Sequence, residues 1–73
     1  MPYVNIRITR EGASPQQKAT LIAGVTQLLV DVLDKDPATT VVVIDEVELD
    51  SWGMGGLPAP AYREVLKRAR AGS

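Results

Sequence analysis

The chain has 73 residues, which allows one small domain, expected to span residues 1–73, near the lower size limit for a self-sufficient hydrophobic core. It contains neither cysteine nor histidine, and this excludes a disulfide framework and the usual ligand set of a structural zinc site. Eight basic against nine acidic residues give a net charge of −1, so we expect no nucleic-acid or anionic-membrane partner. The N-terminus lacks a basic region followed by an apolar run, and the longest apolar runs are too short to span a membrane, so we expect a cytoplasmic protein.

Residues 2–9 alternate between apolar and polar side chains. Val4, Ile6 and Ile8 occupy every second position, with polar residues between them. This period of two predicts a β-strand over residues 2–9 with one apolar face. Gly12 then marks a connecting loop.

A long amphipathic helix is predicted over residues 14–34. Ser14 is a typical N-cap, Pro15 suits the first helical position, and Gln17 stands where a capping box places its partner. Apolar side chains then recur at spacings of one, three and four residues and form a stripe: Leu21, Ile22, Val25, Leu28, Leu29, Val32 and Leu33.

A second strand is predicted over residues 41–46, where β-branched residues follow one another. Two strands joined by a helix make a βαβ unit, in which the strands are parallel. The glycine-rich segment 50–56 is predicted to be a hairpin or a loop. The remaining tail, 57–73, has a short basic helix as one alternative, and its basic residues mark either a solvated face or a binding surface.

Self-association is expected on physical grounds. A two-stranded sheet covered on one face leaves its other face and both edges open, and such a sheet is not stable alone. We therefore expect a homo-oligomer in which residues 50–56 and the tail reach a neighbouring copy.

These features, from Met-Pro before the first strand to Trp52-Gly53-Met54-Gly55-Gly56, resemble the tautomerase superfamily, specifically the 4-oxalocrotonate tautomerase (2-hydroxymuconate tautomerase) family. The resemblance covers residues 2–56. It implies an α/β fold: a βαβ protomer with two parallel strands, one long helix and a C-terminal hairpin or tail. It also implies a homo-oligomer, with a hexamer built as a trimer of dimers as the expected state.

The resemblance implies that Pro2 is the catalytic base once Met1 is removed. Its free secondary amine would shuttle a proton in the keto–enol tautomerisation of a small enol or 2-oxo acid, without metal or organic cofactor. An α-amino group titrates near about 8, and an apolar pocket containing a cation lowers that pKa toward neutrality. Trp52 matches the aromatic residue that covers the proline in the family.

The chain also departs from the family pattern. By the resemblance, the two substrate-binding arginines correspond to Ala13 and Val42, which cannot grip a carboxylate. Arg10 in the longer loop and Arg7 in the strand are the candidate replacements. The alternatives are that Arg10 pairs with Glu11 in solvent and that Arg7 is a cross-strand partner for an acidic residue.

Other functions remain open from the sequence. Pro2 also suits a hydratase, a dehalogenase or an imine-forming enzyme, although Met54 stands where the water-adding branches carry an acidic residue. A non-enzymatic oligomer that has lost its catalytic arginines is the third alternative.

Overall fold

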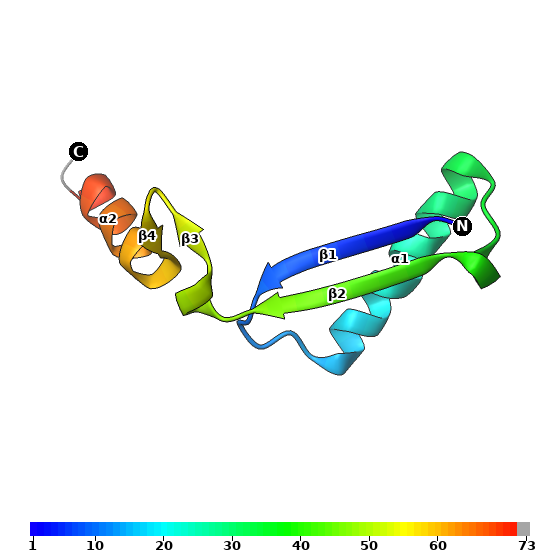
Figure 1. Ribbon diagram of the computed structural model, residues 1–73, viewed down its shortest axis with the longest axis horizontal. Coiled ribbons are helices and arrows are strands. Elements are labelled where there is room, and N and C mark those ends of the chain that lie inside the picture. Colours follow the sequence, from blue (N-terminus) through cyan, green and yellow to red (C-terminus); the bar gives the residue numbers. More distant parts are fainter. Residues whose placement is uncertain (72–73) are drawn as a thin grey trace.

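A parallel two-stranded sheet with one helix across it forms the body of the protein, and the computed structural model describes residues 1–71 (Figure 1). Strand β1 (Tyr3–Thr9) pairs with β2 (Val41–Val47) in parallel, and α1 (Pro15–Leu33) connects them. The predicted βαβ protomer is confirmed.

Helix α1 begins and ends at residues that satisfy its free backbone groups. The N–H of Gln17 donates to the Ser14 hydroxyl at 3.1 Å, and the Ser14 N–H donates to the Gln17 side chain at 2.8 Å. This capping box contributes on the order of 1 kcal/mol. At the other end Asp34 adopts a left-handed φ of 54° and its N–H donates to the carbonyls of Leu29 and Val30. A 3-10 turn, η1 (Pro37–Thr39), then leads into β2.

The two faces of the sheet differ because side chains alternate along each strand. Val4, Ile6 and Ile8 are half-buried on the side where α1 lies. On the opposite face, Tyr3 and its partner Val41 remain 65% and 42% exposed. One face of the sheet is thus left without a covering layer from the described residues of the protomer.

The C-terminal arm, residues 49–71, leaves the sheet after β2 (Figure 1). It consists of a 3-10 turn η2 (Leu49–Ser51), a two-stranded hairpin of β3 (Gly53–Met54) and β4 (Leu57–Pro58), and helix α2 (Ala59–Ala71). Of the two alternatives for residues 50–56, the hairpin is correct, and it extends to Pro58. The tail forms 13 residues of helix, because a proline at position 60 falls in the first turn, where no helical N–H is lost.

Helix α2 packs back onto the hairpin. The Ala59 N–H donates to the Trp52 carbonyl at 2.7 Å, and Ala59 is fully buried. Gly55, with φ of 59°, lies against the Tyr62 ring so closely that a Cβ there would come within 2.8 Å of it. The arm is therefore a small folded unit in its own right.

The protomer has almost no core of its own. Ala59 is the one residue classed as buried among those that the structure describes. The radius of gyration is 16.8 Å, against about 11 Å for a compact domain of this length, and the molecule measures 50 × 23 × 22 Å. Large apolar side chains on α1, including Leu28 and Val32, are more than half exposed. Neither helix in residues 1–71 combines the length and hydropathy that crossing a membrane requires.

Candidate active site

Pro2 is fixed at the start of the sheet. It immediately precedes β1, is half-buried, and its carbonyl accepts a hydrogen bond of 3.0 Å from the N–H of Val41. Met1, in front of it, is 93% exposed. While Met1 is attached, the Pro2 nitrogen is an amide without basicity; its removal would leave a secondary amine held on the sheet by the backbone.

An open hollow of about 570 Å³ lies at the other end of β1, where that strand runs into its loop. It brings Arg7 and Trp52 together from the strand and the arm. Its full lining is Arg7, Ile8, Thr9, Glu11, Gly12, Ala13, Gln17 and Trp52. Ala13 therefore faces the same space as Arg7.

Charges in the hollow are paired but accessible. The Arg7 guanidinium lies 3.5 Å from the Asp45 carboxylate and is 64% exposed. Asp45 also accepts a hydrogen bond of 2.7 Å from the Asn5 amide. The cross-strand pairing that was one alternative for Arg7 is thus present, and an exposed surface pair of this kind is weak enough to exchange with a ligand carboxylate.

Glu11 connects the hollow to the arm. Its carboxylate accepts a hydrogen bond of 2.7 Å from Arg63 on α2 and another from the Thr9 hydroxyl. Arg63 and Thr9, by these bonds, lower the pKa of Glu11 to about 2. Glu11 in turn raises the pKa of Arg63. Arg63 was not among the residues selected from the sequence, because it lies 52 positions from Glu11 and only the arm brings it there.

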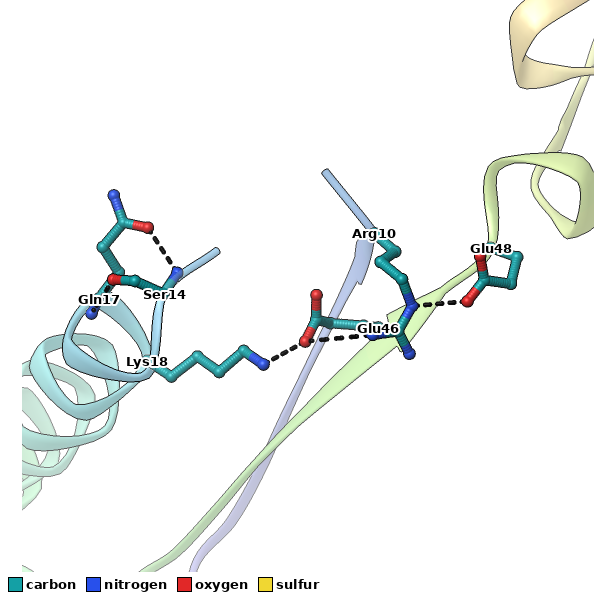
Figure 2. A network of polar contacts seen from close by, with 6 residues as sticks. All are labelled: Arg10, Ser14, Gln17, Lys18, Glu46 and Glu48. Carbon is teal, nitrogen blue, oxygen red and sulfur yellow. Dashed lines mark hydrogen bonds and ion pairs between the residues drawn. The ribbon is translucent and has the colours of Figure 1, made fainter. Parts of the chain in front are cut away.

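Arg10 does not line the hollow. Its Nε donates to Glu48 at 2.5 Å, and its guanidinium lies 3.9 Å from Glu46, which also binds Lys18 of α1 (Figure 2). Lys18 lowers the pKa of Glu46, with a smaller contribution from Arg10. The alternative pairing of Arg10 with Glu11 is wrong, because Glu11 turns to Arg63.

Pro2 and the hollow are far apart within one protomer. Arg7, the lining residue nearest to Pro2 along the chain, lies five residues further on, which corresponds to roughly 17 Å along an extended strand. A small molecule cannot touch Pro2 and Trp52 of the same chain. Any site that uses both residues must take them from different copies.

Comparisons with known proteins agree on one family. A family model described as tautomerase enzyme matches residues 2–61. The chain is 71% identical over 56 residues to probable tautomerase K2 of Dickeya dadantii, an alignment that covers 77% of this chain and 84% of the relative.

Solved structures share the fold. The crystal structure of DmpI from Helicobacter pylori superposes with a TM-score of 0.79 at 42% identity and covers 86% of this chain and 97% of that one. A heterohexameric 4-oxalocrotonate tautomerase from Chloroflexus aurantiacus gives a TM-score of 0.73 at 28% identity, with 82% and 95% covered.

Proposed function

The chain belongs to the tautomerase family, and from that membership we propose that it interconverts the keto and enol forms of a small 2-oxo acid, with Pro2 as the catalytic base. The observation that supports this assignment most directly is the position of Pro2. It follows Met1 and immediately precedes the first strand of a tautomerase fold. Removal of Met1 is the required processing step.

In the proposed reaction the Pro2 amine takes the proton from the enol hydroxyl and the resulting prolinium returns a proton to carbon. The O–H bond breaks, a C–H bond forms, and the double bond moves to the carbonyl, so that no co-reactant is consumed. A base that works near neutral pH needs a pKa near neutral, and a nearby cation such as Arg7 would lower the pKa of the amine toward it.

We propose that the substrate carboxylate binds Arg7 and that Trp52 covers the reacting end. Arg7 is exposed beside Trp52 in the hollow, whereas Arg10 would have to exchange Glu48 for the substrate. Arg10 is therefore the second choice for this contact. With Ala13 and Val42 at the positions of the family's arginines, one guanidinium favours a mono-acid over a dicarboxylate.

The proposed site is shared between copies of the chain. Pro2 of one protomer would meet Arg7 and Trp52 of another, because Pro2 precedes β1 while the hollow with Arg7 and Trp52 lies near the other end of that strand. The exposed apolar faces support assembly, and the related Chloroflexus enzyme is a heterohexamer. We propose a homo-oligomer here, with a hexamer of three dimers as the arrangement to test.

The test of the proposed base is Pro2→Ala in protein expressed without an N-terminal tag, with intact mass confirming that Met1 is absent. Alanine keeps an N-terminal amine but removes the ring, and we expect kcat/KM for ketonisation of phenylenolpyruvate to fall about 10²-fold or more. Gln16→Ala, on the exposed side of α1, is the control and should keep wild-type turnover.

Unchanged turnover in an assembled Pro2→Ala protein would exclude Pro2 as the base and favour a non-enzymatic oligomer. Borohydride trapping of an aldehyde on the N-terminal peptide would instead support the imine-forming alternative.

A further inference from the structure

Charge is distributed very unevenly along this chain. Residues 59–71, which form α2, contain four cations and one carboxylate, a net charge of +3. Residues 1–58 contain four cations and eight carboxylates, a net charge of −4. The net charge of −1 is therefore the sum of a basic helix and an acidic body.

Three of the four cations of α2 form one stripe. Arg63, Lys67 and Arg70 follow one another at spacings of four and three, so they share a helix face. Together with Leu66 they line a hollow of about 290 Å³. Arg63 is held by Glu11 at one end of the stripe, whereas Lys67 forms no ion pair within residues 1–71. Arg68 lies on the opposite face of the helix.

Half of the eight carboxylates of the body already have a cation. Glu11, Asp45, Glu46 and Glu48 each lie within ion-pair distance of an arginine or lysine. The acidic end of α1, which we define as Asp31, Asp34 and Asp36, has no such pair among the described residues; with Lys35 between the last two, its net charge is −2.

Negative charge is also unfavourable at the acidic end of α1, because the helix dipole already places partial negative charge there. The last turn of α1 contains no basic residue to offset it. An external cation would relieve this repulsion.

The basic stripe and the acidic end cannot meet within one protomer. The acidic end precedes β2, while α2 lies beyond the far end of β2, at the other extreme of a molecule 50 Å long (Figure 1). We propose that α2 of one copy docks on the acidic end of α1 of a second copy, with Lys67 facing its carboxylates.

Apolar contact would accompany these charges. Leu66 on the stripe side of α2 is 39% exposed, and Val32 and Leu33 beside the acidic end are 69% and 57% exposed. A head-to-tail contact of this kind uses two different surfaces and closes into a ring when the rotation between copies allows it. The docking does not depend on the proposed chemistry, because its test measures assembly and not turnover.

The decisive experiment is a charge exchange measured by sedimentation velocity at low salt. Lys67→Glu should weaken assembly about tenfold, because it replaces attraction to the net negative charge of the acidic end by repulsion. Arg68→Glu makes the same change in net charge on the opposite face and should leave assembly near that of wild type. The double variant Lys67→Glu/Asp31→Lys should recover most of the lost affinity.

Asp31→Lys places a cation in the last turn of α1, where it suits the helix dipole, and far-UV circular dichroism checks that each variant folds. Equal weakening by Lys67→Glu and Arg68→Glu, or no recovery in the double variant, would overturn the docking. The docking would also be overturned by a wild-type chain that stays monomeric and sediments with phosphatidylserine vesicles, if Lys67→Glu abolishes that co-sedimentation. Loss of turnover in a fully assembled Pro2→Ala protein would leave it intact.

Discussion

Glu11 determines how the loop after β1 is joined to the arm. The carboxylate is exposed, yet Arg63 and Thr9 both donate to it and Arg63 comes from a helix 52 residues later. Exposed ion pairs usually contribute little to the free energy of unfolding. The importance of this pair is its position, because it links the hollow that contains Arg7 and Trp52 to α2.

The Glu11–Arg63 pair predicts an unusual acid titration. The pKa of Glu11 is lowered to about 2 by Arg63 and Thr9, below the 4.5 of an unpaired glutamate. Ionised Glu11 therefore stabilises the folded state fully above pH 4.5, and this contribution is lost as the pH falls from 4.5 toward 2. Carbon-13 NMR of the Glu11 carboxyl group should give a midpoint close to 2.

Arg63→Ala is the matched variant for this titration. It removes the strongest donor and should move the Glu11 midpoint upward toward the ordinary value, while the Glu46 pair with Lys18 is unaffected. A wild-type midpoint near 4.5 would mean that the hydrogen bond between Arg63 and Glu11 does not form when the protein is in solution.

At the level of elements, the arm depends on a close approach between the hairpin and α2. Gly55→Ala would strain a left-handed φ and place a methyl group 2.8 Å from the Tyr62 ring. We expect a loss of about 1–3 kcal/mol in unfolding free energy and faster tryptic cleavage within α2. The readouts are urea denaturation and limited proteolysis.

Gly53→Ala is the control for the hairpin. It makes the same chemical change two residues away, but its Cβ would lie 3.8 Å from the Leu57 carbonyl, an ordinary contact. Equal destabilisation by both substitutions would show that α2 does not pack on the hairpin through Tyr62.

The sequence predicted the elements whose signal is local. Alternation identified β1, and the Ser14 and Gln17 pair identified the start of α1, because both patterns depend only on near neighbours. Helix α2 was harder to predict, because Pro58 and Pro60 suggest that no helix forms there. The structure places Pro60 in the first turn of α2, where proline is tolerated. The partner of Arg10 could not be inferred either, because Glu48 reaches it only through the register of β1 and β2.

The same division applies to the candidate site. Arg7 and Trp52 were selected from the sequence, and the structure places both at one hollow. Their distance from Pro2 follows from the length of β1, which the residue pattern does not give. Arg63 could not be selected for this site because only the folded arm brings it to Glu11. Local sequence therefore identifies the candidate residues, and the topology determines which of them lie close together within one protomer.

At the scale of the whole molecule, stability and assembly are expected to be inseparable. One buried residue among positions 1–71 and a radius of gyration of 16.8 Å leave that part of the protomer without the apolar burial that offsets chain entropy. We predict that the thermal midpoint rises with protein concentration over a hundredfold range, on the order of several degrees, because subunit contacts bind only the folded state. Circular dichroism melts at each concentration measure this shift. Lys67→Glu should lower the midpoint most at the dilute end, where assembly limits folding, and Arg68→Glu should follow the wild-type curve. A midpoint independent of concentration would mean that the isolated protomer is stable, against the burial observed.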